Sequence, residues 1–259
     1  MEVSGKIAIV TGAGGGGSGR AIAKRLAREG ASVVVNDLDG PGGRETVSQI
    51  EVDRGKAAFF QADVSSESQV KALITFAEST FGGLDILVSS AGAHFSQGPL
   101  ESWVETIQGN LMASAFGTLH AIESMRKRGG GAIVNFSSTS ALGHGRKHSP
   151  WPAYDIAKAG IIRLTTTMAW LKEKERIRVN CIAPAWIASN EVKEFWEPLT
   201  PQQRKEYGAP EVLLTLDEVA DAVLELISND NLAGRVMVLW NGEPRRLIEE
   251  GDAGYAKLE

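Results

Sequence analysis

The sequence contains a single cysteine, Cys181, among its 259 residues. One cysteine can form neither an intrachain disulfide nor a CxxC metal or redox site, which favours a reducing, cytoplasmic location. No apolar run approaches the roughly 18 residues of a membrane-spanning helix, so we expect no membrane partner. The first residues show neither the basic stretch nor the apolar core of a signal peptide, and we expect none.

Positively charged residues are also fewer than negatively charged ones. There are 27 Lys and Arg residues against 32 Asp and Glu residues, for a net charge of −5. Binding to a phosphate backbone needs clustered positive charge, so no nucleic-acid partner is expected. Hydrophobic residues make up 43% of the chain and charged residues 23%, as in an ordinary globular protein. The chain shows neither an internal repeat nor a linker-like change in composition, which predicts a single domain over residues 1–259.

Short β-rich runs alternate with longer amphipathic runs along the whole chain. The β-rich runs are apolar almost throughout, as in a parallel sheet that is covered on both faces. The pattern predicts a doubly wound α/β fold with about seven parallel strands and helices on both faces. We expect strands at residues 7–11, 32–36, 57–61, 85–89, 132–137, 178–183 and 236–239, and helices at 20–29, 43–53, 66–81, 102–128, 154–175 and 215–228.

Two helix starts carry the pattern of a capping box, one at Ser66–Gln69 and one at Thr215–Glu218. The longest irregular stretch is 184–214, and a loop of that length in a compact domain is usually a functional lid. Residues 243–259 are interpreted as a C-terminal tail.

A glycine-rich loop follows the first predicted strand and opens a helix. Its sequence, residues 11–19, fits GxGxxG in two registers, Gly12-Gly14-Gly17 and Gly14-Gly16-Gly19. Glycines allow close approach of the backbone, and the free N–H groups of the helix start favour a pyrophosphate. With so many glycines the match alone is also compatible with a flexible turn.

Asp37 lies at the end of the second predicted strand, twenty residues after Gly17. A carboxylate there can accept both hydroxyls of an adenosine ribose and repels a 2′-phosphate, which favours NAD over NADP. No Lys or Arg lies inside the glycine loop to reverse that preference. Alternatives at this point are an ordinary turn aspartate or another enzyme that uses an adenosine cofactor, such as a methyltransferase.

Tyr154 and Lys158 are four residues apart on a predicted helix and therefore share a face. An ammonium about 4 Å from a phenolate stabilises it by roughly 4 kcal/mol at an effective dielectric constant near 20. That is roughly 3 pKa units, enough to make the tyrosine a proton acceptor from an alcohol near neutral pH. The alternative is a helix-surface pair. The hydroxyls of Ser137 and Ser138, at the carboxyl end of the fifth predicted strand, favour the catalytic interpretation because ligands bind at that edge of a doubly wound sheet.

With these motifs in order, the sequence resembles the short-chain dehydrogenase/reductase family over essentially its whole length. Its TGxxxGxG pattern is similar to Thr11-Gly12 with Gly17-Ser18-Gly19, with one extra residue before Gly17. Further matches and departures are Asp63-Val64, Ser89-Ser90-Ala91-Gly92 in place of Asn-Asn-Ala-Gly, Asn110, Asn180 with Pro184-Ala185, Ile187 with Ser189, and Trp240-Asn241-Gly242 in place of Asp-Gly-Gly.

The resemblance implies a Rossmann-type dehydrogenase that transfers a hydride between NAD(H) and a secondary alcohol or ketone. Its implied catalytic residues are Asn110, Ser138, Tyr154 and Lys158. Tyr154 would act as general acid and base, Lys158 would lower its pKa and hold the nicotinamide ribose, Ser138 would orient the substrate, and Asn110 would hold a relay water. The implied cofactor-binding residues are Gly12, Gly17, Ser18, Gly19, Asp37, Leu38, Asp63, Val64, Ser90, Ala91, Gly92, Tyr154, Lys158, Pro184, Ile187 and Ser189.

Candidate substrate-contacting residues lie after the fourth strand, before Tyr154 and in the predicted lid: His94, His144, His148, Trp151, Trp186 and Trp196. His144 and His148 have an HxxxH spacing, but without cysteine partners or an HExxH motif we expect no metal. The resemblance also implies a homodimer or homotetramer. A non-enzymatic NAD-binding sensor or scaffold stays open because of the departures from the family pattern.

Overall fold

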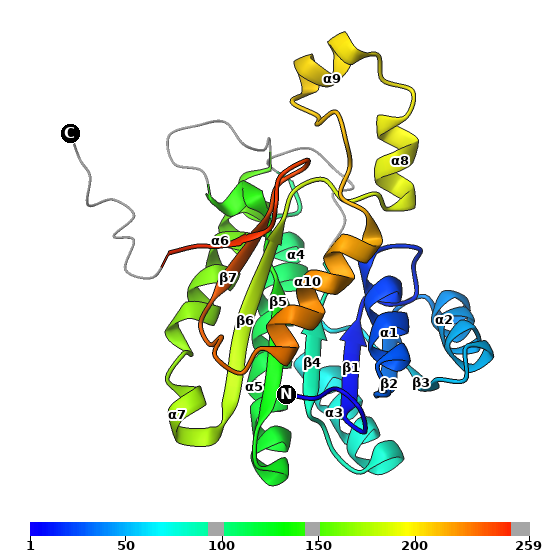
Figure 1. The fold of residues 1–259 in the computed structure, drawn as a ribbon, viewed down its shortest axis with the longest axis vertical. Coiled ribbons are helices and arrows are strands. Elements are labelled where there is room, and N and C mark those ends of the chain that lie inside the picture. Colours follow the sequence, from blue (N-terminus) through cyan, green and yellow to red (C-terminus); the bar gives the residue numbers. More distant parts are fainter. Residues whose placement is uncertain (93–100, 143–150, 250–259) are drawn as a thin grey trace.

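The computed structural model describes residues 1–92, 101–142 and 151–249. Eight strands form one sheet in the order β3-β2-β1-β4-β5-β6-β7-β8, and every neighbouring pair is parallel except β7 with β8 (Figure 1). The strands are β1 Ile7–Thr11, β2 Ser32–Asp37, β3 Lys56–Gln61, β4 Ile86–Ser89, β5 Gly131–Phe136, β6 Ile177–Pro184, β7 Val236–Leu239 and β8 Arg246–Leu247. The predicted doubly wound sheet of seven parallel strands is confirmed. The eighth, antiparallel strand comes from the segment that the sequence predicts as a tail.

Helices cover both faces of the sheet. In Figure 1, α1, α2 and α10 lie on one face, while α3, α5 and α6 lie on the other. The helices are α1 Ser18–Arg28, α2 Gly40–Val52, α3 Glu67–Phe81, α4 Trp103–Ile107, α5 Ala113–Arg128, α6 Pro152–Thr167, α7 Leu171–Glu175, α8 Asn190–Trp196, α9 Pro201–Tyr207 and α10 Leu216–Ser228. Within the described ranges, no helix has both the length and the apolarity that crossing a bilayer requires.

The core is divided by the sheet. On one side, Ile22 and Leu26 of α1 and Val223 of α10 pack against strand residues such as Val10. On the other side, residues of α3 and α5 such as Leu73 and Met125 pack against the alternate strand residues. All residues of β1, β4, β5 and β6 are buried, which is why these strands are mostly apolar rather than alternating.

One of the two predicted capping boxes forms. Thr215 Oγ1 accepts the Glu218 N–H at 3.1 Å, and the Glu218 carboxylate accepts the Thr215 N–H at 2.7 Å, as expected. The prediction at Ser66 is wrong, because the Ser66 hydroxyl bonds to Ser68 and makes no cap bond. The Gln69 amide oxygen instead accepts the Asp63 N–H at 2.9 Å and steadies the turn before α3.

Each of the two long predicted helices is interrupted. The helix expected over residues 102–128 contains a π-helical segment, Gln108–Met112, between α4 and α5. The helix expected over residues 154–175 is broken between α6 and α7, after three consecutive threonines. The hydroxyl of Thr167 donates back to the Arg163 carbonyl at 2.7 Å, a bond that competes with the regular helix ladder.

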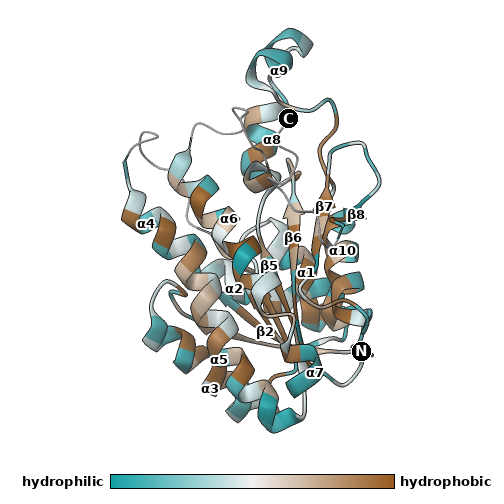
Figure 2. Cartoon of the chain, turned by 90° about the vertical axis from the view of Figure 1, so that its left-hand side faces the viewer, coloured by the Kyte–Doolittle hydropathy of each residue, from teal (hydrophilic) through white to brown (hydrophobic). Residues whose placement is uncertain are grey.

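The predicted lid, 184–214, is not an irregular loop, because it contains helices α8 and α9. Both have seven residues and no buried residue, and Figure 2 shows α9 as mainly hydrophilic, in contrast to the apolar strands of the sheet. Such short, exposed helices leave no apolar periodicity in the sequence. Their caps do leave a pattern: Ser189 accepts the Val192 N–H, and Thr200 and Gln203 form a capping box that our sequence analysis missed.

Candidate active site

The site lies where the strand order reverses, between β1 and β4. The carboxyl ends of these strands lie side by side, with Thr11 paired to Ser89. Ligands bind at such switch points in doubly wound sheets. A cleft of about 890 Å³ opens here, and its walls are the glycine loop, the ends of β2 and β3, the segment after β4, the α4–α5 junction and the first residues of α8.

Close contacts explain why three positions of the loop are occupied by glycine. Gly12 has φ +67°, and a Cβ there would lie 2.8 Å from the Cα of Ala91. A Cβ at Gly19 would overlap the carbonyl oxygen of Gly12, so the turn packs tightly on the start of α1. A Cβ at Gly14 would lie 2.8 Å from the Cβ and Cγ of Asp37. By contrast, a Cβ at Gly15 meets nothing within 4 Å.

Asp37 is fixed at the end of β2 by the loop itself. The Gly14 N–H donates to Asp37 Oδ2 at 2.7 Å, and the Asp39 N–H donates to Oδ1 at 3.0 Å. Asp37 lines the cleft, and so do other acidic residues. They are Asp39, Asp63, Glu105 and Glu191, and no described lining residue is a lysine or arginine.

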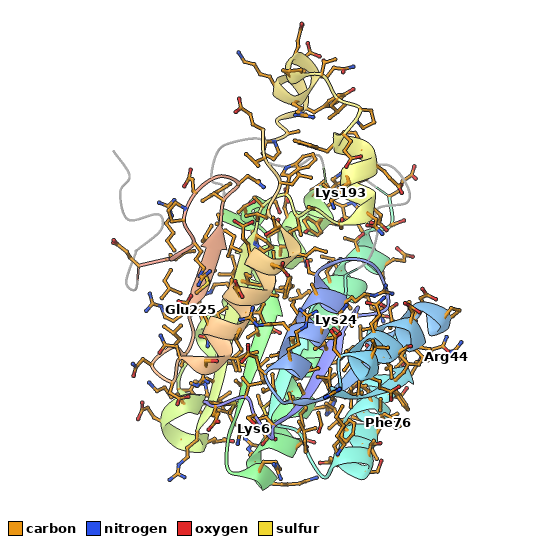
Figure 3. The ribbon with its side chains drawn as sticks, turned by 45° about the vertical axis from the view of Figure 1, so that its right-hand side comes forward. Lys6, Lys24, Arg44, Phe76, Lys193 and Glu225 are labelled. Carbon is orange, nitrogen blue, oxygen red and sulfur yellow. The ribbon has the colours of Figure 1, made fainter. Side chains whose placement is uncertain are left out.

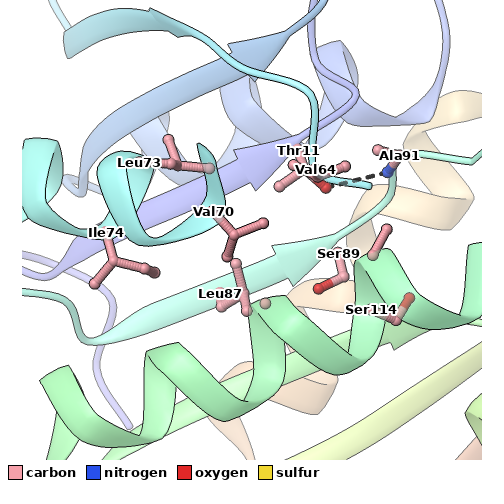
Figure 4. Close-up of a pocket in the computed structure, with 11 residues that line it drawn as sticks. Thr11, Val64, Val70, Leu73, Ile74, Leu87, Ser89, Ala91 and Ser114 are labelled. Carbon is pink, nitrogen blue, oxygen red and sulfur yellow. Dashed lines mark hydrogen bonds between the residues drawn. The ribbon is translucent and has the colours of Figure 1, made fainter. Parts of the chain in front are cut away.

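At the end of β4, serines stand where the family that the sequence resembles has amides, and one of them, Ser90, braces the site. The Ser90 hydroxyl donates to the Thr11 carbonyl at 2.7 Å. The Ala91 N–H donates to Thr11 Oγ1 at 3.1 Å (Figure 4). The Ser89 hydroxyl is buried and has no partner among the described residues. It borders a cavity of about 10 Å³ behind the cleft, between β4, α3 and α5, with Ser114 on its wall (Figure 4).

Asn110 lies in the π-helical segment, and π-helical turns are common at functional sites. Its Nδ2 donates to the Thr106 carbonyl at 2.9 Å. Its Oδ1 is buried and has no partner within the described ranges. A Cβ at Gly92 would lie 2.9 Å from that oxygen and 4.0 Å from Lys158 Nζ, so both groups border the same small region.

Lys158 is 5% exposed, and its ammonium donates to the Phe136 carbonyl at 3.0 Å. Its own carbonyl accepts the Ser137 hydroxyl at 2.7 Å, which joins α6 to the end of β5. The ammonium lies 5.3 Å from the centre of the Tyr154 ring. Burial lowers the pKa of Lys158 to about 8.

Tyr154 lies in the first turn of α6, which begins with Pro152 at a position where proline needs no hydrogen-bonded N–H. Burial raises the pKa of the Tyr154 phenol, and the negative charge of Asp155 adds to the rise. The hydrogen bond with Ser138 lowers the pKa of Tyr154. The net direction differs from the lowered pKa that we expect from the sequence, because burial outweighs the Ser138 hydrogen bond.

The remaining sequence-predicted residues divide into three groups. Gly17, Leu38, Asp63, Val64, Ser90, Ala91 and Gly92 line the cleft with Gly12 and Asp37. Ser18 begins α1, Pro184 ends β6, Ile187 pairs with Leu214, and Ser189 caps α8. His94, His144 and His148 lie outside the described residues.

Trp186 and Trp196 make contacts within the predicted lid, and the predicted tryptophans do not form one shared wall of a substrate site. Trp186 stacks on Phe195 at 6.1 Å between ring centres, and its backbone is held by the Asn241 side chain. Trp196 donates its indole N–H to the Pro210 carbonyl at 2.8 Å and lies under the Arg204 guanidinium. Trp151 immediately precedes α6.

Asn190 and Glu191 begin α8 and line the cleft, and neither is predicted from the sequence. A Cβ at Gly16 would lie 2.7 Å from Asn190 Nδ2, so the lid touches the glycine loop. No local pattern could show this contact, because the two segments are about 170 residues apart and meet only through the fold.

A doubly wound sheet with this loop, and with serine, tyrosine and lysine beside it, defines a nucleotide-binding oxidoreductase. The sequence model of the family described as short chain dehydrogenase matches residues 6–199. The chain belongs to this family, which typically uses a nicotinamide cofactor.

Individual proteins that the chain is similar to carry the names of dehydrogenases. The chain is 34% identical to a cyclohexanol dehydrogenase of Acinetobacter sp., with 87% of this chain and 88% of the relative covered. It is also 34% identical to glucose 1-dehydrogenase 2 of Bacillus subtilis, with 88% and 90% covered. A solved 7α-hydroxysteroid dehydrogenase, in complex with NADH and 7-oxo glycochenodeoxycholic acid, superimposes with a TM-score of 0.83 at 29% identity, covering 95% of this chain and 97% of that one.

Proposed function

We propose that the protein is an NAD-dependent dehydrogenase that interconverts a secondary alcohol and a ketone. The observation that carries the proposal is the convergence of Ser138, Tyr154 and Lys158 beside an acidic cleft with Asp37 at its end. Relatives that act on cyclohexanol and on a hydroxysteroid carry names of the same reaction class.

The residues of the cleft fit a dinucleotide. Gly15 and Gly17 line the cleft and leave room there that a Cβ would fill, and the N-terminus of α1 favours the pyrophosphate. Asp37 would accept the adenosine ribose hydroxyls, and Lys158 would hold the nicotinamide ribose. When bound, NAD⁺ supplies the hydride acceptor.

The acidic lining favours NAD over NADP. A 2′-phosphate would bring about two further negative charges next to Asp37, in a cleft that already has Asp39 and Asp63 on its wall. Arg20 lies close to the loop, but its Nε donates to Thr46 Oγ1 at 2.8 Å and its Nη2 donates to the carbonyls of Gly14 and Gly42. These bonds hold the loop on α2, and Arg20 is not among the described residues that line the cleft.

In the oxidation direction, Tyr154 acts as the general base and accepts the alcohol proton at its phenol oxygen. Ser138 lowers the pKa of Tyr154 through its hydrogen bond and orients the substrate oxygen. The positive charge of Lys158, held by the Phe136 carbonyl, favours the phenolate. The Oδ1 of Asn110, which has no partner among the described residues, lies near Lys158 and can accept a hydrogen bond from a water that carries the proton onward.

A spectrophotometric screen tests this function. We expect NADH to form at 340 nm when the protein, NAD⁺ and a panel of secondary alcohols, including cyclohexanol and a hydroxysteroid, are mixed. The control is the double variant Ser138→Ala/Tyr154→Phe, purified in the same way to exclude contaminating host dehydrogenases. Turnover that survives in the double variant, or none with any alcohol or corresponding ketone, contradicts the proposal.

We also propose a cytosolic homodimer or homotetramer. The supporting observation is that apolar side chains on the outer helices are exposed, among them Val104 of α4, Leu119 of α5 and Ile156 of α6. Multi-angle light scattering checks the assembly: a dimer or tetramer mass is expected, and a monomer would contradict it.

A further inference from the structure

A second cavity adjoins the glycine loop. It measures about 520 Å³ and shares Gly16 and Gly17 with the cofactor cleft. Its other walls come from α1, from Gln49 of α2, from Ala188 and Lys193 of the lid and from the start of α10. A volume of this size falls in the range of small-molecule sites.

The charge of this groove is opposite to that of the cofactor cleft. Arg20, Lys24 and Arg28 line it at intervals of four residues, so they form one stripe along α1. Lys193 of α8 adds a fourth cation, and Asp217 is the one acidic residue among the described lining residues. Figure 3 shows Lys193 above Lys24 on the side of the molecule that faces the viewer.

Most of this positive charge is not neutralised by carboxylates. Lys24 Nζ donates to the neutral Gln49 Oε1 at 3.0 Å. Arg20 donates to the Thr46 hydroxyl and to two backbone carbonyls, all neutral acceptors. Arg28 is paired with Asp53 at 3.1 Å. Lys193 has no hydrogen bond or ion pair from its ammonium within the part of the chain that the structure describes. Arg20 and Lys24 are thus held in place while their charge stays available.

We propose that this groove binds a small polyanion that carries two or more phosphate groups, at a site that adjoins the cofactor cleft and shares Gly16 and Gly17 with it. Phosphate oxygens accept charge-assisted hydrogen bonds from lysine and arginine. Because Lys193 belongs to the lid and Lys24 to α1, the bound anion holds the lid against the core of the protein.

Isothermal titration calorimetry with inorganic pyrophosphate tests the site, in the presence of saturating NADH so that the glycine loop is occupied. We expect one binding event per chain in the wild type. In the double variant Lys24→Gln/Lys193→Gln we expect the affinity to fall by about tenfold or more, as for the loss of two charge-assisted bonds.

The matched control is Lys71→Gln/Lys205→Gln, which removes the same charge from exposed positions outside the groove. It is expected to bind pyrophosphate within about twofold of the wild type, since screening weakens distant surface charges. Equal weakening in both double variants, or no binding by the wild type, overturns the proposal.

A second titration with ADP distinguishes the source of the phosphates. An affinity well above that of pyrophosphate identifies a nucleotide site, and an equal affinity identifies a site for phosphate groups alone; no binding of either ligand overturns the inference. NADH binding is measured separately by fluorescence, so its failure counts against the proposed function and not against the groove.

Discussion

The cofactor cleft and the lid are held in different ways. The cleft rests on β1 and β4, whose residues are all buried, and on hydrogen bonds such as those from Gly14 to Asp37 and from Ser90 to Thr11. The lid rests on α8 and α9, two fully described helices without a buried residue. Its aromatic side chains are correspondingly open, with Phe195 47% and Tyr207 61% exposed.

This difference separates two kinds of selectivity. The proposed function assigns cofactor preference to a part of the molecule where small changes disturb buried packing. It assigns substrate preference to a segment that can change shape at little cost to the core. Variants in one region should therefore leave the other region's ligand largely unaffected.

The largest effect is expected at Tyr154 of α6. Tyr154→Phe removes the proton-transferring hydroxyl, and we expect kcat to fall by about 10²–10⁴-fold. The NADH dissociation constant, measured by fluorescence titration, should stay within about threefold. The control is Tyr207→Phe, on the exposed end of the lid, which should retain most of its activity. A similar kcat for the two variants would remove Tyr154 from the mechanism.

The next largest effect is expected at Gly14, which differs from its neighbour Gly15 in its contacts. A Cβ at Gly14 would lie 2.8 Å from Asp37, whereas a Cβ at Gly15 meets nothing within 4 Å. We expect Gly14→Ala to weaken NADH binding by about tenfold or more, which corresponds to about 1.4 kcal/mol. Gly15 lines the cleft, so Gly15→Ala tests contact with the bound cofactor and not the contact with Asp37. An NADH affinity of Gly14→Ala within about twofold of the wild type would show that the contact between the loop and Asp37 is not needed for binding.

Helix caps test the contrast in stability. Thr215 caps α10, which packs on the core, and Thr200 caps the exposed α9. We expect Thr215→Ala to lower the free energy of unfolding by about 1 kcal/mol in urea titrations. Thr200→Ala should leave the global midpoint unchanged and increase amide exchange only within the lid. A comparable global loss in both variants would mean that the lid unfolds together with the core.

The smallest effect is expected inside the lid. The Arg204 guanidinium lies 3.6 Å from the centre of the Trp196 ring, a contact worth about 0.5–1 kcal/mol at exposed sites. We expect Arg204→Met to raise the substrate KM by about two- to fivefold without changing the NADH dissociation constant. Lys205→Met is the control and should alter neither. An increase in the NADH dissociation constant with an unchanged KM would reverse the assignment of the two regions.

The buried sheet could be predicted from the sequence, whereas the exposed helices of the lid could not. The parallel sheet follows from the apolar strands, and Asp37 lines the cleft where its spacing from Gly17 places it. The lid helices have seven residues each and no apolar face, so periodicity could not reveal them. The approach of Asn190 to Gly16 depends on tertiary packing alone.

The effects of burial on Tyr154 and Lys158 could not be predicted from the sequence either. The spacing of Tyr154 and Lys158 places them on one helix face but does not show that the ammonium donates to Phe136, or that burial raises the pKa of the phenol. Desolvation depends on every neighbouring side chain, and a local motif contains only a few of them.

The most direct test of the proposed cofactor is fluorescence titration of NADH and NADPH with the wild type, Asp37→Ala and the control Asp217→Ala, whose carboxylate lies outside the cleft. We expect the wild type and Asp217→Ala to bind NADH at least about tenfold more tightly than NADPH, and Asp37→Ala to lose most of that preference. Tighter binding of NADPH by the wild type, or an unchanged preference in Asp37→Ala, would contradict the role of Asp37.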